Sequence, residues 1–195
     1  TIWGTQFTRD DKRILTWAND GSVRLWDITT GKESFSPLRH NKNVSGAIFS
    51  ESEKQILSWS DDYTARLWDI KSGKQIGQSF KHEAELMGAS FSPTNSHVLT
   101  WSRDSTTRLW DINTSLQVFP PLRHNRIVNY SFFATNGHDI ITWCWGENIT
   151  IWRLGTDLDL PPTLFKEQAA VMTGWELDES TGVLQLIETE RLRKL

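Results

Sequence analysis

The sequence has little of several features that many protein classes require. It has a single cysteine, Cys144, among 195 residues, which excludes an intrachain disulfide framework and predicts a reducing, cytoplasmic setting. No apolar run approaches the ~20 residues that span a bilayer, and no signal-peptide pattern is present, so no membrane contact is expected. Only two tyrosines accompany eleven tryptophans. This tryptophan content predicts a large core, since each ring buries a large apolar area.

The charged residues show no strong excess of either sign. The formal net charge is −3, and the basic residues are spread along the chain, whereas a nucleic-acid surface usually shows a clustered basic footprint. The sequence also has no metal-ligand spacing, phosphate-binding loop or nucleotide fingerprint. It therefore predicts no nucleic-acid partner, no metal and no cofactor.

One short stretch recurs along the chain. It reads NDGSVRLWDITTGK at 19–32, SDDYTARLWDIKSGK at 60–74 and SRDSTTRLWDINTS at 102–115, with a diverged copy, WGENITIWRLGTD, at 145–157. The tryptophans of these stretches are spaced by 42 residues: Trp26, Trp68, Trp110 and Trp152. A fixed period of this size is typical of stacked repeat architectures.

The second unit shows what each repeat is expected to form. Its short apolar stretches are bounded by turn residues and lie at 44–50, 55–60, 64–70 and 75–80. Their spacing and their β-branched and aromatic residues predict four antiparallel strands. Turn signals about every ten residues argue against helices. A sheet that is apolar on both faces needs a neighbour on each side, so the repeat predicts radially stacked sheets, a β-propeller.

A second tryptophan series lies inside the second predicted strand of each unit, at Trp17, Trp59, Trp101 and Trp143. Alternation along the first of these strands places Ile14 and Thr16 on one face and Leu15 and Trp17 on the other. We therefore predict that this series packs between neighbouring sheets and does not bind a ligand.

With Trp-Asp pairs on a 42-residue period, residues 1 to about 165 resemble the WD40 repeat family. The resemblance implies an all-β fold, a β-propeller of WD40 blades with four full four-stranded blades and a C-terminal β-hairpin that forms half a blade. The expected units are 1–42, 43–84, 85–126, the diverged 127–168, and 169–195 with the hairpin and a charged tail. The hairpin strands are expected at 170–177 and 183–187.

The same resemblance bears on the completeness of the ring. WD40 propellers usually have seven or more blades and share one blade between the chain ends, so the chain is expected to be the C-terminal portion of a larger propeller. A closed four-bladed ring, and a ring completed by self-association of two chains, are the alternatives. The tail at 173–187 also resembles the end of WD40 arrays in bacterial signalling ATPases of the STAND class, in which the propeller is a sensor.

WD40 blades commonly contain a buried hydrogen-bonded tetrad of Trp, Ser or Thr, His and Asp. The matching residues are His40, Ser58, Asp62 and Trp68 in the second blade, His82, Thr100, Asp104 and Trp110 in the third, His124, Thr142 and Trp152 in the fourth, and Thr16, Asp20 and Trp26 in the first. In such a tetrad Asp accepts from His, His bonds the hydroxyl, and the hydroxyl meets the indole N–H, which satisfies every member. Gly146 and Arg153 replace two aspartates in the fourth blade, which is expected to be the least rigid.

The resemblance further implies that partners contact the turns. The matching positions are Asn43, Glu85 and Arg126 before the first strands, and Asn19, Asp61 and Arg103 between the second and third strands. These residues differ between repeats while the framework is constant, as expected of loops that recognise partners. The predicted function is a non-catalytic scaffold, a sensor or partner-binding module of a larger signalling protein that binds a protein or another domain of its parent.

Two other functions are considered. One is a structural or autoinhibitory role in assembling a larger protein. The other is a propeller hydrolase with an active site in the central channel. The Ser/Thr–His–Asp set argues against the hydrolase because it recurs in several repeats, whereas a catalytic triad is needed once. Arg24, Arg66 and Arg108 also recur and are expected to be structural. Only His97 and His138 lie outside the repeated histidine position, and both precede second strands.

Overall fold

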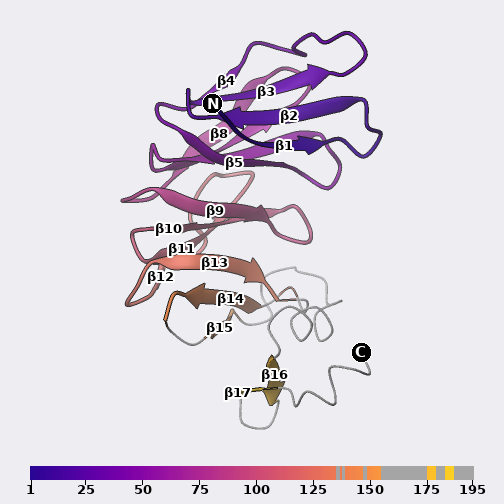
Figure 1. The fold of residues 1–195 in the computed structure, drawn as a ribbon. Coiled ribbons are helices and arrows are strands. Elements are labelled where there is room, and N and C mark those ends of the chain that lie inside the picture. The colour runs from indigo at the N-terminus through magenta and orange to yellow at the C-terminus, as the bar shows by residue number, and fades with distance from the viewer. Residues whose placement is uncertain (135–136, 138, 147–148, 155–174, 179–182, 187–195) are drawn as a thin grey trace.

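The computed structural model describes residues 1–134, 137, 139–146, 149–154, 175–178 and 183–186. All regular structure in these residues is antiparallel β-sheet, and the first four sheets lie one after another along the chain (Figure 1). The first sheet contains β1 (Ile2–Phe7), β2 (Arg13–Ala18), β3 (Ser22–Asp27) and β4 (Leu38–Arg39). The second contains β5 (Val44–Phe49), β6 (Gln55–Ser60), β7 (Thr64–Asp69) and β8 (Lys74–Lys81). The third contains β9 (Leu86–Phe91), β10 (His97–Ser102), β11 (Thr106–Asp111) and β12 (Leu122–Arg123).

The fourth sheet is described over three strands, β13 (Val128–Phe133), β14 (Asp139–Cys144) and β15 (Thr150–Arg153). The expected fourth strand of this blade lies outside the described residues. Further along, β16 (Trp175–Asp178) pairs with β17 (Val183–Leu186), and the expected strand residues before Trp175 also lie outside the description. The all-β propeller fold predicted from the repeat is confirmed, and within each sheet sequential strands are neighbours.

Every interface between neighbouring blades uses the same positions. We call the surface that a blade turns to the following blade its C-side face, and the surface that it turns to the preceding blade its N-side face. In the first interface, the C-side face consists of Leu15, Val23, Leu25 and Leu38, and the N-side face of Val44, Ala47, Phe49, Ile56, Trp68 and Ile70. Adding 42 to each number gives the positions of the next interface. Burial of these two apolar faces holds the stack together.

Three members of the second tryptophan series pack at these interfaces, as predicted. Trp17 packs against the first interface, Trp59 against the second, and Trp101 against Val128 and Cys144 of the fourth sheet. Each of the three tryptophans lies on a glycine of the adjacent first strand, paired as Gly4 with Trp17, Gly46 with Trp59 and Gly88 with Trp101. A Cβ atom on these glycines would come within 2.0–2.3 Å of the indole ring, so only glycine lets the ring lie flat on the strand.

The fourth blade departs from this pattern because Tyr130 occupies the position of the glycine and pairs with Trp143. The two rings stack at 5.9 Å with an interplanar angle of 12°, and Trp145 lies 6.2 Å from Trp143. Tyr130 is 60% exposed and Trp145 is 71% exposed. The fourth blade therefore presents an aromatic surface where the first three blades have a covered glycine.

The aspartates of the Trp-Asp pairs close the turns after the third strands. Asp69 Oδ1 accepts from the backbone N–H of Ser72 at 2.8 Å and from its hydroxyl at 2.6 Å. Asp27 and Asp111 accept in the same way from Thr30 and Thr114. These hydrogen bonds lower the pKa of all three carboxyls. The Trp-Asp signature therefore combines a core residue with the residue that ends the strand.

Candidate functional site

The tetrad of the second blade is assembled from residues on three segments. His40 follows β4, Ser58 lies on β6, and Trp68 on β7. His40 Nε2 lies 2.8 Å from Ser58 Oγ, and Trp68 Nε1 donates to the same oxygen at 2.8 Å. His40 Nδ1 lies 3.1 Å from Asp62 Oδ2. Because an ionised carboxylate only accepts, Nδ1 carries the proton and Nε2 accepts from the serine hydroxyl.

The third blade has the same arrangement with a threonine in place of the serine. His82 Nε2 and Trp110 Nε1 each lie 2.8 Å from Thr100 Oγ1. His82 Nδ1 lies 2.9 Å from Asp104 Oδ2. In both blades the hydroxyl residue is fully buried and the histidine side chain has no exposed surface. Each tetrad is therefore a closed polar network inside the stack.

Each tetrad also joins two blades. The backbone N–H of His40 donates to Gly21 O of the first blade at 2.8 Å, while its ring reaches Asp62 and Ser58 of the second blade. The backbone N–H of His82 donates to Tyr63 O of the second blade, while its ring contacts Asp104 of the third blade. The histidine therefore fixes the outer end of one blade to the centre of the next.

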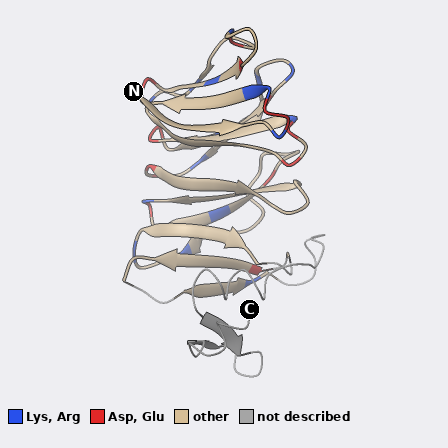
Figure 2. Cartoon of the chain, turned by 45° about the vertical axis from the view of Figure 1, so that its right-hand side comes forward, with Lys and Arg blue, Asp and Glu red and all other residues tan. Residues whose placement is uncertain are grey.

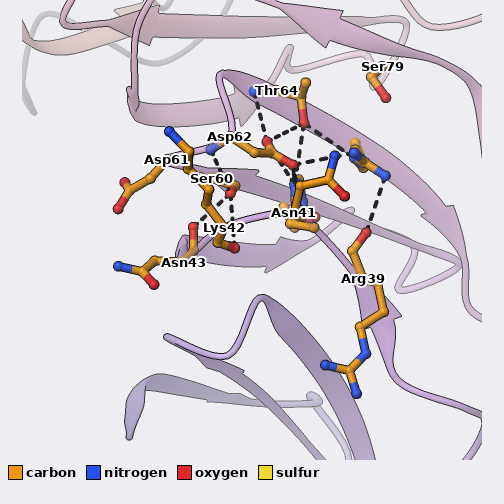
Figure 3. A network of polar contacts seen from close by, with 12 residues as sticks. Arg39, Asn41, Lys42, Asn43, Ser60, Asp61, Asp62, Thr64 and Ser79 are labelled. Carbon is orange, nitrogen blue, oxygen red and sulfur yellow. Dashed lines mark hydrogen bonds and ion pairs between the residues drawn. The ribbon is translucent and has the colours of Figure 1, made fainter.

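Two further residues of each blade complete the network, and neither was predicted to belong to it. Thr64 Oγ1 donates to Asp62 at 2.6 Å, and Arg66 Nη2 lies 3.3 Å from the same carboxylate (Figure 3). Arg66 Nη1 also donates to Arg39 O at 3.2 Å. Thr106 and Arg108 repeat these contacts around Asp104. The repetition of Arg66 and Arg108 was visible in the sequence, and their expected structural role agrees with these bonds.

The environment of each tetrad favours the charged form of the aspartate and the neutral form of the histidine. Burial alone would raise the pKa of Asp62, but hydrogen bonds from His40, Thr64 and the backbone N–H of Asn41 outweigh it and lower the pKa. The pKa of Asp104 is lowered by the equivalent donors. Burial lowers the pKa of His40 and of His82, although the neighbouring aspartate favours the charged ring. At neutral pH each pair is therefore a neutral imidazole on a carboxylate.

The first and fourth blades retain only part of the network. Trp26 Nε1 donates to Thr16 Oγ1 at 3.0 Å, and Trp152 Nε1 donates to Thr142 Oγ1 at 2.9 Å. Asp20 bonds Ser22 and Arg24, and the hydroxyl of Ser22 is the main cause that lowers its pKa to about 2. The Asp20 side chain is 47% exposed, compared with 4% for Asp62.

In the fourth blade, His124 packs edge-on against Trp152 at 5.3 Å. Gly146, which stands in place of the aspartate, has a positive φ of 75°.

The residues predicted to contact partners lie on turns at one end of the sheets, on the left in Figure 1. We call this set the turn row: Asn19, Asn43, Asp61, Glu85, Arg103 and Arg126. Asp61 N–H donates to Asn43 O at 3.0 Å, and Arg103 N–H donates to Glu85 O at 2.9 Å. In the second and third blades the structure therefore places the residue that precedes the first strand beside the matching turn residue, and Figure 3 shows Asn43 and Asp61 together.

The turn row is held by a serine that was not predicted to have a role. Ser60 Oγ donates to Asn43 O at 2.7 Å and accepts from Asp62 N–H at 3.0 Å. Ser102 makes the same bonds to Glu85 and Asp104. The 42-residue recurrence of this serine was the signal that could have identified it. One serine thus links the buried tetrad to the exposed turn.

The fourth blade differs in this region as well. The 42-residue register pairs Asn43 and Glu85 with Ile127, which is 39% exposed, and Arg126 lies one residue earlier. Trp145 takes the position of Asn19, Asp61 and Arg103, and its N–H donates to Asn129 Oδ1 at 2.7 Å. Neither Ile127 nor Trp145 was among the residues predicted to contact a partner.

The tetrad side chains are arranged to hold the fold together. In the second and third tetrads the hydroxyl is bonded by both a histidine and a tryptophan, and it is fully buried, so it has no open side for a substrate. Over the described ranges, no three His, Cys, Asp or Glu side chains gather as a metal site. Lysines, arginines and acids are interspersed over the described part of the chain (Figure 2).

The part of the chain that the structure describes includes no helix with the length and apolar character of a membrane span.

Comparison with known proteins identifies the repeat. The family model "WD domain, G-beta repeat" matches residues 73–111. The crystal structure of the computationally designed Ika4 protein is similar, with a TM-score of 0.68 and 22% identity, over 80% of this chain and 92% of that chain. The computationally designed Ika8 protein has a TM-score of 0.67 and 24% identity, over 78% of this chain and 46% of that chain. No curated protein sequence matches the chain.

The structural likenesses show the fold, and the matched repeat supports the WD40 family. WD40 repeats generally mediate protein–protein interactions and are generally non-catalytic.

Proposed function

We propose that this chain is a non-catalytic protein-interaction module whose partner binds the turn row. The observation that carries this proposal is the contrast between a constant framework and variable turns. Asp61 and Arg103 make the same backbone bond to the preceding segment, yet their side chains have opposite charges. Loops held rigidly while their side chains vary are suited to recognition.

The turn row offers different chemistry from blade to blade. The second blade has Asp61 near Lys42, whose Nζ lies 4.7 Å from the centre of the Tyr63 ring. The third blade has Glu85 beside Arg103. A protein surface with several charged and aromatic groups could engage these turns together, and aromatic and arginine side chains are typical of the residues that dominate interface energetics.

In this proposal the module is a cytoplasmic sensor within a larger signalling protein of the STAND class. Its partner is another protein or another domain of the same parent. The support for this context is the resemblance of the tail at 173–187 and the non-catalytic character of the repeated networks.

The test uses a variant in which Asn43, Glu85 and Arg126 are all replaced by alanine, which leaves the net charge unchanged. The control is Glu51→Ala with Lys54→Ala, which is also charge-neutral and alters the turn between β5 and β6 at the other end of the sheet. Wild type, variant and control are immobilised at equal density, and the proteins that each retains are quantified by mass spectrometry. We expect at least one protein to be retained by wild type and control and lost from the triple variant. Equal retention by all three would reject the turn row.

A further inference from the structure

The interface between the third and fourth blades, which we call the third interface, cannot form a bond that links the earlier blades. At the first two interfaces a backbone N–H in the turn after a first strand donates to a side chain in the same turn of the next blade: Arg9 to Glu53 Oε1 at 2.7 Å, and Glu51 to Asn95 Oδ1 at 3.5 Å. The matching residues of the third interface are Pro93 and Gly137. Proline has no N–H and glycine has no side chain, so this bond is lost.

Two other bonds between blades are lost at the same interface. At the first two interfaces an arginine donates to a carbonyl of the preceding blade: Arg66 Nη1 to Arg39 O at 3.2 Å, and Arg108 Nη1 to Lys81 O at 3.1 Å. The matching residue of the fourth blade is Thr150, at the same register of its sheet, and its short side chain carries no guanidinium. Gly146 likewise removes the carboxylate that the histidine of the preceding blade binds at the earlier interfaces.

The third interface also buries two hydroxyl groups at positions that are apolar in the other interfaces. Thr107 on the C-side face of the third blade is 0% exposed, and Ser131 on the N-side face of the fourth is 2% exposed. Counting all described residues, neither hydroxyl has a hydrogen-bond partner. The same positions of the earlier interfaces hold Val23 and Ala65, and Ala47 and Ala89. Because a buried hydroxyl without a partner is costly, the third interface gains less from closing than the others.

The contacts that remain at the third interface are two hydrogen bonds and an apolar cluster. Trp101 Nε1 donates to Asn129 O at 3.0 Å, and the backbone N–H of His124 donates to Ser105 O at 2.9 Å. The cluster consists of Leu99, Leu109, Leu122, Phe133 and Ile140. The fourth blade is therefore held mainly by apolar burial, which is not directional.

We propose that the stack opens at the third interface, so that the fourth blade separates from the third while the first three blades stay folded. In a stack of repeats, stability is approximately a sum of the stabilities of the units and of the contacts between neighbours. The weakest contact therefore opens at a lower free energy than global unfolding. The third interface is the weakest of the three because it has lost three kinds of bond and buries two unpaired hydroxyls.

The side chain of Cys144 can report this opening. It is the single cysteine of the chain, it is 2% exposed, and it packs with Trp101 and Val128 at the third interface. N-ethylmaleimide reacts with the thiol only when the interface opens or the chain unfolds. The labelling rate of the full chain, measured by mass spectrometry and divided by the rate in the denatured chain, gives the fraction of open molecules.

A chain with Ser102→Cys and Cys144→Ser moves the thiol to the second interface. Ser102 is fully buried and holds the position of Cys144 one repeat earlier, and serine is the native residue there in the second and third blades. Urea denaturation of each chain gives the labelling rate that global unfolding alone allows. We expect Cys144 to react about tenfold or more faster than this rate, and the moved thiol to react at this rate.

A repaired interface tests whether the opening occurs where we propose. Thr107→Val with Ser131→Ala introduces residues that hold the same positions in the first blade and in the second and third blades. This pair should slow the labelling of Cys144 by about tenfold or more, because the closed state no longer buries two unpaired hydroxyls. Thr29→Val with Ser36→Ala is the matched control at exposed positions of the first blade and should leave the rate unchanged.

Three results would overturn the proposal. Labelling of Cys144 at the rate of global unfolding would show that the fourth blade does not open separately. Equally fast labelling of the moved thiol would show that the third interface is not the weakest. Equal labelling rates in the repaired and control chains, each found to be folded by circular dichroism, would place the opening elsewhere. No partner of the turn row takes part in these measurements, so this inference and the proposed function can fail independently.

Discussion

The hydroxyl of Ser58 or Thr100 joins the two halves of its tetrad. It accepts from the indole N–H and donates to the histidine, and these two bonds have nearly equal lengths in both blades. The histidine then holds the aspartate that caps the next turn. Loss of one oxygen atom would leave two buried groups without a partner, and buried unpaired groups are costly.

Thr100→Val tests this role because valine matches the shape of threonine without the oxygen. We expect the free energy of unfolding to fall by about 2–4 kcal/mol, since both His82 Nε2 and Trp110 Nε1 lose their partner. Thr100→Ser keeps the oxygen and should retain most of the stability. Urea denaturation followed by tryptophan fluorescence measures both; equal loss in the two variants would mean that the methyl group, and not the hydroxyl, is what matters.

At the scale of the sheet, the stack depends on a contact between a first-strand glycine and a second-strand tryptophan. The indole of Trp101 lies on Gly88, and its Nε1–H donates to Asn129 O of the next blade at 3.0 Å. The same ring thus covers its own sheet and bonds the following one. This geometry fixes the spacing between blades, because interiors are close-packed and tolerate little extra volume.

Gly88→Ala should destabilise the fold by about 1–3 kcal/mol, because the new Cβ would lie 2.0 Å from Trp101 Cζ2 and the ring would have to move. In a Trp101→Leu background the same substitution should cost much less, since the clash is removed. A double-mutant cycle measures this coupling. Additive effects of the two changes would contradict the proposed contact.

At the scale of the whole molecule, histidines in several blades make the stability of the fold depend on pH. Burial lowers the pKa of His40, His82 and His97 below the ordinary value of 6.5. The unfolded chain therefore binds protons at these residues at a pH where the folded chain does not. Stability is fully present above pH 6.5 and is lost as the pH falls from 6.5 toward the folded pKa values.

We expect the free energy of unfolding to decrease between pH 7 and pH 5, by at most about 1.4 kcal/mol per pH unit for each of the two buried histidines, His40 and His82. Below the ordinary aspartate pKa of 3.8, the lowered pKa of Asp62 and Asp104 predicts a further loss. Denaturant unfolding at a series of pH values checks both windows. A His40→Gln, His82→Gln chain should be less stable but show a shallower slope between pH 7 and pH 5; an unchanged slope would assign the effect elsewhere.

Much of this architecture could be predicted because it repeats. The 42-residue period located the strands of the second unit to within one or two residues, and the resemblance to WD40 blades indicated the four residues of the second and third tetrads. It did not identify Ser60 as the link to the turn row or place Trp145 on that row, because both roles depend on which groups face each other across a turn. The stacking of Tyr130 on Trp143 depended on strand register, which the spacing alone does not specify.

The sequence by itself determined the repeat and the order of the strands, because both follow from local alternation and from residues a fixed distance apart. The resemblance to WD40 blades indicated the four members of the second and third tetrads, but not the threonine and arginine that complete each network. Only the tertiary structure decided which copies of a repeated position are buried. Phe7 and Phe49 differ in exposure although their positions in the repeat are the same. A side chain is buried only where another sheet packs against it, and the packing of sheets is a property of the tertiary structure.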